Sequence, residues 1–151
     1  MATVSSIPTF LDALKAALVI RAGLTGVNIF TGPVDPESEG PEAIVFGAEA
    51  IETTTEFPTV PRLECWETYI LTGRIWVAKP GAGETVIKAA RDRAFALLEQ
   101  VHDELATNDE MTATVTDVRP VGWRLEQGIV ENERQCRITF SLRVEARFTP
   151  A

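Results

Sequence analysis

The stretch formed by residues 136–148 alternates between apolar and polar side chains without interruption. Its even positions are apolar and its odd positions are polar, which is the period of a β-strand with one buried and one exposed face. The apolar set is Cys136, Ile138, Phe140, Leu142, Val144, Ala146 and Phe148. At about 3.3 Å per residue this stretch spans roughly 40 Å, which is also the diameter of a compact chain of this length. We therefore expect the strand to cross the whole domain and the core to be built on it.

Composition indicates one globular domain covering residues 1–151, because 45% of the 151 residues are hydrophobic. The 14 basic and 22 acidic residues leave a net charge of −8, which disfavours nonspecific binding to nucleic acid. No apolar run approaches 18 residues, so no membrane contact is expected. Cys65 and Cys136 lie outside any zinc-binding spacing and are predicted to be reduced core residues.

Two amphipathic helices and five strands are predicted, in the order α-β-β-β-α-β-β. The predicted helices are residues 8–22 and 84–106, and the strands are residues 27–31, 43–48, 62–77, 111–125 and 136–148. Ser6 is the expected cap of the first helix. Pro120 predicts an edge position or a bulge, because proline cannot donate to a strand ladder. The predicted fold class is α+β, with a mostly antiparallel twisted sheet of about five strands packed by two helices. Residues 126–133 are expected to connect the last two strands, as an antiparallel pair.

Two segments are predicted to be mobile loops, near residues 32–42 and 49–61. The first is rich in proline and glycine and carries Asp35, Glu37 and Glu39, which is typical of a solvated loop rather than a metal site. The second is extended and contains Phe57, which could pack on its own domain or on a partner.

The strand at residues 62–77 carries Trp66, Arg74 and Trp76 on the face opposite its core side chains. Aromatic residues with arginine on an outer strand face favour a protein–protein contact. The alternative is that a helix of the same chain covers them. The polar face of the last strand carries Arg137, Arg143 and Arg147, which is a basic surface in an acidic chain. It is either a contact for an acidic patch or a solvated face.

No motif in the chain carries recognisable catalytic chemistry. The sequence lacks HExxH, a Walker loop and a Gly-x-Ser-x-Gly elbow. Its single histidine, His102, follows Glu99 as in half of a di-iron site, but no second copy exists. Every acidic cluster is expected in a loop or on a helix surface, where solvent keeps the pKa values of carboxyl groups near normal. We predict no catalytic residue, no cofactor and no metal, and no enzyme activity.

The order of elements resembles the tail terminator family of long-tailed phages, also called the tail completion or minor tail proteins. The resemblance covers nearly the whole chain. It depends on the helix at residues 8–22, the strand at 27–30 with its Gly32-Pro33 turn, the helix at 84–106 and the strand at 135–149.

This resemblance implies a structural virion protein, with no catalytic site. Family members form hexameric rings that cap the tail tube at the head-proximal end of the tail, stop its polymerisation and meet the head–tail connector. DNA only passes through the lumen, and assembly takes place in the host cytoplasm. The implied interface residues are Phe57, Trp66, Arg74, Trp76, Arg137, Arg143 and Arg147. The three arginines of the last strand would make a head-to-tail contact with an acidic patch of the next subunit, and residues 49–61 would touch the tube.

Two other functions stay open at this point. One is a neck or head-completion adaptor, which also forms rings. The other is a small-molecule binding α+β domain, which would use a cavity between the main helix and the sheet.

Overall fold

The computed structural model describes residues 4–35, 39–56, 65–108, 111–112 and 114–148. Phe57 lies outside these described residues. The elements in chain order are α1 (Ile7–Val19), the short 3-10 helix η1 (Ala22–Leu24), β1 (Asn28–Phe30), β2 (Glu42–Phe46), β3 (Thr53–Glu56), β4 (Cys65–Pro80), α3 (Glu84–Thr107), β5 (Val115–Val130) and β6 (Glu133–Phe148).

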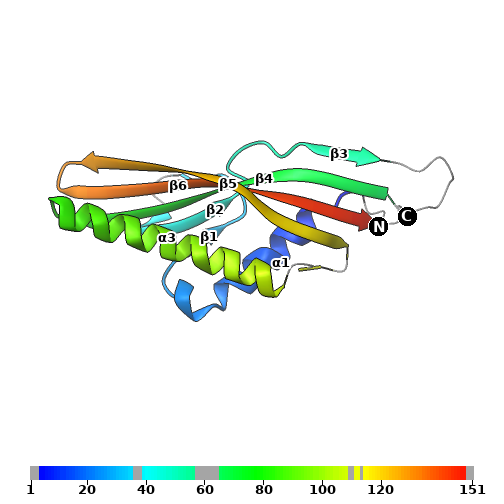
Figure 1. The fold of residues 1–151 in the computed structure, drawn as a ribbon, viewed down its shortest axis with the longest axis horizontal. Helices are drawn as coiled ribbons and strands as arrows, with labels where there is room; N and C mark the ends of the chain where they lie inside the picture. The colour runs from blue at the N-terminus through cyan, green and yellow to red at the C-terminus, as the bar shows by residue number, and fades with distance from the viewer. Residues whose placement is uncertain (1–3, 36–38, 57–64, 109–110, 113, 149–151) are drawn as a thin grey trace.

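The strands form one sheet with the order β1-β2-β4-β6-β5, and β3 pairs with β4 beyond the end of β2. Every pairing is antiparallel except that of β1 with β2. Both α-helices pack on the same side of the sheet, so the molecule has two layers (Figure 1). The predicted α+β class and its order of elements are confirmed, with one strand more than the sequence predicted.

Three strands of 16 residues each, β4, β5 and β6, set the long dimension of the molecule. Each spans about 50 Å at roughly 3.3 Å per residue. β6 lies between the other two and pairs with them along its length. Its even positions from Cys136 to Phe148 are all buried, as the alternation predicts. The expectation that the core is built on this strand is confirmed.

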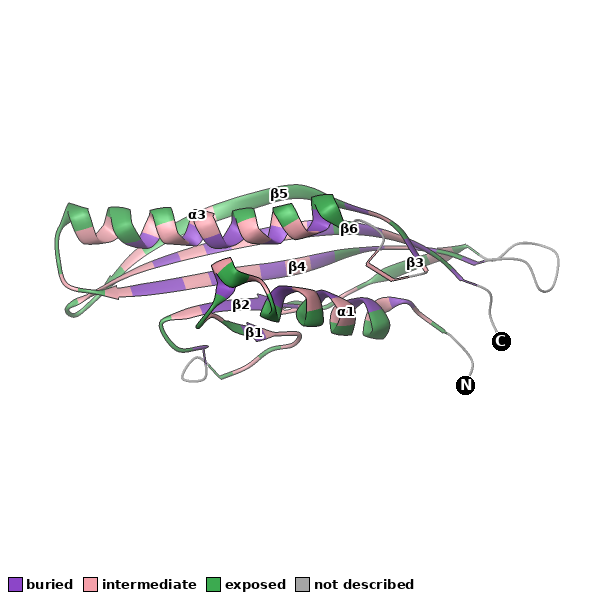
Figure 2. Ribbon diagram, turned by 90° about the horizontal axis from the view of Figure 1, so that it is seen from below, coloured by how far each residue is buried: buried purple, intermediate pink, exposed green. Residues whose placement is uncertain are grey.

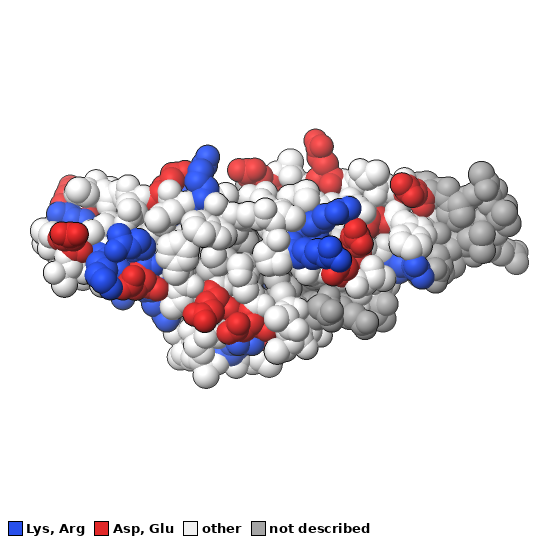
Figure 3. Space-filling model, viewed as in Figure 1, with Lys and Arg blue, Asp and Glu red and all other residues white. Residues whose placement is uncertain are grey.

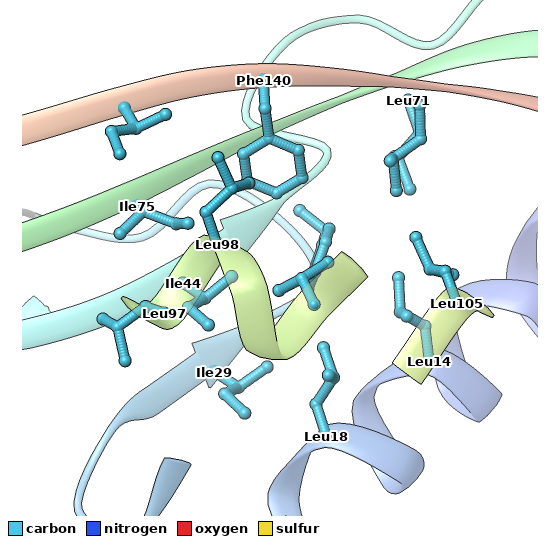
Figure 4. Close-up of a cluster of buried hydrophobic side chains, with 14 of the residues drawn as sticks. Leu14, Leu18, Ile29, Ile44, Leu71, Ile75, Leu97, Leu98, Leu105 and Phe140 are labelled. Carbon is cyan, nitrogen blue, oxygen red and sulfur yellow. The ribbon is translucent and has the colours of Figure 1, made fainter. Parts of the chain in front are cut away.

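The core lies between the sheet and the two helices. Helix α3 contributes Ala90, Ala94, Leu97, Leu98, Val101 and Leu105, and α1 contributes Phe10, Leu14 and Leu18. These side chains meet Ile44, Leu71, Ile75 and Phe140 from the sheet and fill the space between the layers (Figure 4). The helix side facing the sheet is buried and the opposite side is exposed (Figure 2).

Two predictions about local structure were wrong. The segment predicted as an extended loop at residues 49–61 contains strand β3, whose Thr53–Glu56 pair with Tyr69–Trp66 of β4. The segment predicted to connect the last two strands is instead mostly strand, because β5 continues to Val130 and β6 begins at Glu133. Glu131 turns the hairpin with a φ of 49°. Both corrections have one cause, since a partner strand supplies hydrogen bonds that local composition does not reveal.

Pro120 behaves as predicted. It lies on β5, an edge strand of the sheet, and the register with β6 shifts between Pro120 and Gly122. A second shift occurs between Val115 and Asp117.

Ser6 is the N-cap residue of α1, as predicted, but its side chain bonds to a buried carboxylate of the sheet and not to the helix. Its hydroxyl donates to Glu67 Oε1 at 2.6 Å, and its backbone N–H donates to the same oxygen at 2.9 Å. Glu67 is a buried carboxylate of β4, with 1% of its surface exposed. It therefore holds the beginning of α1 on the sheet, where a negative charge also suits the helix dipole.

Both cysteines are buried and free, as predicted. Although β4 and β6 are neighbours, Cys65 lies opposite Phe148 and Cys136 lies opposite Val77. The two thiols are therefore at opposite ends of the strand pair, too far apart for a disulfide.

Within the described part of the chain, no helix has both the length and the apolar character needed to cross a membrane.

Candidate interface on the open sheet face

One face of the sheet points away from α1 and α3, and neither of these helices lies on it (Figure 1). We call this the open face. Its members on the two central strands are Trp66, Thr68, Ile70, Thr72, Arg74 and Trp76 of β4 and Arg137, Thr139, Ser141, Arg143, Glu145 and Arg147 of β6. Neither α1 nor α3 therefore covers the two tryptophans of this face.

A tryptophan–arginine pair stands near each end of this face. Arg147 lies over the Trp66 ring at 4.0 Å from its centroid, and the two residues are direct cross-strand partners. Arg137 lies over the Trp76 ring at 5.8 Å, again as its cross-strand partner. The two tryptophans are ten positions apart on β4, or about 33 Å at roughly 3.3 Å per residue. Each cation–π contact holds two large side chains in place.

The surface between the two pairs is partly apolar. Trp66 is 49% exposed and Ile70 is 42% exposed. Ile70 lies opposite Arg143 of β6, which in turn lies opposite Arg119 of β5. An exposed tryptophan and isoleucine among arginines have the composition that recurs in protein–protein contacts.

Arginines on this face alternate with carboxylates rather than forming a uniform basic surface. Arg143 pairs with Glu145 at 3.1 Å, and Arg137 lies 3.9 Å from Glu126 of β5. Blue and red side chains are likewise mixed over the side of the molecule shown in Figure 3. The face therefore offers a pattern of both signs, which favours a specific partner over a generally acidic one.

Arg74 has an internal partner. Its guanidinium donates to Glu39, which is 4% exposed, and Asn28 Nδ2 donates to the Glu39 carbonyl oxygen at 3.0 Å. These contacts hold Glu39 near β2. Ala43 and Val45 of β2 lie on the open face opposite Trp76 and Arg74, and both are nevertheless fully buried. The prediction that Glu39 belongs to a solvated loop was wrong, because a salt bridge with Arg74 compensates for its burial.

Three hollows lie along the open face. One of about 100 Å³ is bounded by Trp76, Glu126 and Arg137, and one of about 150 Å³ by Thr54, Trp66 and Glu145. A third, about 270 Å³, lies between them beside Thr72 and Ser141. Another hollow, about 320 Å³, lies at the β5–β6 turn. Small-molecule sites are usually pockets of roughly 300–1,000 Å³ that enclose their ligand, so the first three better match single side chains of a partner.

Three charged residues of α3 make contacts with other parts of the chain. Arg93 pairs with Glu42 of β2, Glu104 pairs with Arg21 at 2.6 Å, and Arg91 donates to Gln127 at 3.4 Å. No group of three or more histidine, cysteine, aspartate or glutamate side chains in the described residues could hold a metal ion.

Of the seven residues selected from the sequence, Phe57 lies outside the described residues and the other six lie on one face: Trp66, Arg74, Trp76, Arg137, Arg143 and Arg147. Sequence reasoning did not select Ile70, Arg119 or Glu126, which share that face. Ile70 was detectable from the alternation of β4. The two β5 residues were not, because only the pairing of β5 with β6 brings them there.

No protein-family model matches the chain, and no curated protein matches it. A solved structure does: a chain described as "Virion of native gene transfer agent (GTA) particle" matches with a TM-score of 0.58 and 16% sequence identity. The match covers 95% of this chain and 99% of that one. The two chains therefore share a fold along essentially their whole lengths.

Proposed function

We propose that this chain is a structural virion protein that assembles with copies of itself into a ring at the end of a phage tail. The observation that carries the proposal is the full-length fold match, 95% of this chain against 99% of the other, to a chain of a GTA virion. The order of helices and strands that resembles the tail terminator family supports the same conclusion.

The open face is the proposed contact surface of this protein. Trp66, Trp76, Arg137, Arg143 and Arg147 are its proposed interface residues, together with Arg74 and Phe57. The exposed Trp66 and Ile70 supply apolar area, and the hollows beside Trp66 and Trp76 have the volume of side chains. Interface anchors of this kind are large aromatic residues and arginines that fit into small pockets.

The resemblance supplies the rest of the proposed role. The ring is a hexamer that caps the tail tube, stops its polymerisation and presents a surface to the head–tail connector protein. Its place is the head-proximal end of the tail in the virion, after assembly in the host cytoplasm. DNA passes through the lumen, and the net charge of −8 suits a channel that DNA must not adhere to.

Two measurements test this proposal. Purified chain is mixed with tail tubes and followed by analytical ultracentrifugation and negative-stain electron microscopy, where we expect rings at one end of each tube. Trp66→Ala should weaken assembly roughly tenfold or more, as the loss of an interface anchor does. Asp12→Ala, on the exposed side of α1, is the matched control and should assemble normally.

The length of the tails shows at which step of particle assembly the chain acts. Particles made without this chain should carry overlong tails, since nothing would stop the tube from growing. Tails of normal length that fail to join heads would instead assign the chain to the neck. A chain that stays monomeric at high concentration and with tubes present would contradict both ring-forming roles.

A further inference from the structure

Strand β5 leaves a long edge of the sheet unpaired. It is the last strand in the order β1-β2-β4-β6-β5 and has 16 residues, and no described residue pairs with its outer side. Strands average about five to six residues, so this edge is unusually long. An exposed edge presents a row of free N–H and C=O groups that can pair with another strand.

Only the first half of β5 carries a register shift or a proline, which usually hinder such pairing. The two register shifts and Pro120 all lie before Gly122, and the register is regular from Gly122 to Val130. Bulges and proline are two of the devices that protect edge strands. The stretch with regular register and the residue just before it carry exposed apolar side chains, namely Val121, Trp123, Ile129 and Val130.

On the opposite side of the sheet the edge is formed by β1 and, beyond the end of β2, by the acidic strand β3. Strand β3 pairs only with β4 among the described residues, and exposed Glu49, Glu52 and Glu56 lie in or beside it. None of these carboxylates has an ion-pair partner in the described part of the chain. The β5 edge carries Arg119 and Arg124, whose side chains are 72% and 73% exposed.

The two arginines are available for a new contact. Arg119 pairs with Asp117 at 2.6 Å and Arg124 with Glu126 at 2.8 Å, both on the same strand. Ion pairs this exposed contribute little to stability, so a carboxylate from another subunit can replace them.

Strand directions also match. β3 is antiparallel to β4, β4 to β6 and β6 to β5, so directions alternate across the sheet. A second copy that lies beside β5 in the same orientation therefore brings its β3 antiparallel to β5. The antiparallel ladder is the more stable of the two pairings.

We infer that β5 of one subunit pairs with β3 of the next, so that the sheet continues from copy to copy. The contact joins two different surfaces, which is the type that closes a ring when the rotation allows it. The inference rests on the proposed ring, and it names the surfaces that build it: two sheet edges, in addition to the open face.

Cysteine cross-linking tests the pairing directly. The double variants Thr54→Cys with Arg119→Cys and Thr54→Cys with Arg124→Cys place one thiol on each edge, while Cys65 and Cys136 stay buried. Under mild oxidation, at least one double variant should give a ladder of covalent oligomers that ends at the ring size. Thr54→Cys alone should stay monomeric on a denaturing gel, and so should each arginine variant alone. Dimers from Arg124→Cys alone would indicate two-fold pairing of β5 with itself and would overturn the inference.

A charge exchange tests the same contact without oxidation. Arg124→Glu should weaken association about tenfold, and adding Glu56→Arg in the same chain should restore it. Lys15→Glu on exposed α1 is the matched control and should change nothing.

The outcomes separate this contact from the ring itself. Rings that form normally, with no cross-linked ladder and no effect of Arg124→Glu, would refute the edge pairing and leave the ring standing. Failure of the unmodified chain to form rings at all, even with tail tubes, would refute both.

Discussion

Substituting Gly73 should destabilise the core through one specific collision. Gly73 of β4 lies directly opposite Phe140 of β6. A Cβ at position 73 would stand 2.3 Å from Phe140 Cζ and 2.7 Å from both Cε atoms. That is about 1.1 Å short of the 3.4 Å at which ordinary van der Waals contact begins. The ring must therefore move for Gly73→Ala to fold.

The surroundings of Phe140 oppose that movement. The residue is 2% exposed, and its ring meets the Phe46 ring edge-to-face with centroids 5.8 Å apart. Overpacking a core of this kind costs about 1–3 kcal/mol. Alanine also restricts the unfolded chain more than glycine does, and this stabilises the folded state by roughly 0.4–1 kcal/mol. We expect Gly73→Ala to lower the free energy of unfolding by about 1–2 kcal/mol.

Equilibrium unfolding in urea, followed by tryptophan fluorescence at one fixed protein concentration, measures this change. With an m-value of about 2 kcal/mol per M, the midpoint should fall by roughly 0.5–1 M. Gly122→Ala is the matched control, because it is also a strand glycine but nothing lies within 4 Å of its added Cβ. It should leave the midpoint unchanged or raise it slightly.

A double-mutant cycle decides whether the collision is the cause. Phe140→Val removes the ring atoms that the new Cβ would meet and costs about 2–3 kcal/mol, less than the 3–5 kcal/mol typical of Phe→Ala. In that background Gly73→Ala should become neutral or stabilising, which gives a coupling of at least about 1 kcal/mol. An equal effect of Gly73→Ala in both backgrounds would refute the reasoning.

Three further outcomes follow from the buried polar and thiol groups. Burial raises the pKa of Tyr69 to about 12, so the stability that depends on its neutral form is present below about pH 10 and lost as the pH rises to 12. The free energy of unfolding should fall by about 3 kcal/mol over this range. Tyr69→Phe should abolish this pH dependence. Tyrosinate absorbance reports the ionisation of this group alone, because the chain has a single tyrosine. Glu67→Gln should lower the free energy of unfolding in urea by about 1–3 kcal/mol, because it weakens the two hydrogen bonds from Ser6. Unchanged stability would contradict the role of this carboxylate in holding α1 on the sheet. Burial also raises the pKa of the Cys136 thiol, so alkylation of native protein at neutral pH should be slow and should become fast in denaturant; rapid native labelling would show that this part of the core opens.

Most of the fold was predictable from local patterns. The alternation of β6 identified both the strand and its buried side, and the apolar stripe of α3 identified the helix that covers it. Such patterns succeed because the burial of one face imposes a period of two or 3.6 on the residues of the same segment.

The candidate interface was predictable only in part, because β4 carries large apolar residues on both faces. The sequence could not decide whether a helix or a partner covers Trp66 and Trp76. The answer depends on which face of the sheet α1 and α3 cover, and that choice depends on the packing of the whole sheet.

What the sequence by itself determined is therefore the set of long amphipathic segments and the side chains that each presents on either face. Only the tertiary structure decided that residues 53–56 become a strand, that the β5–β6 hairpin extends to its turn, and that Glu67 is buried under Ser6. The reason is physical. These features depend on hydrogen bonds between partners distant in the chain, such as the 61 positions that separate Ser6 from Glu67, and such contacts impose no periodicity on the residues around them.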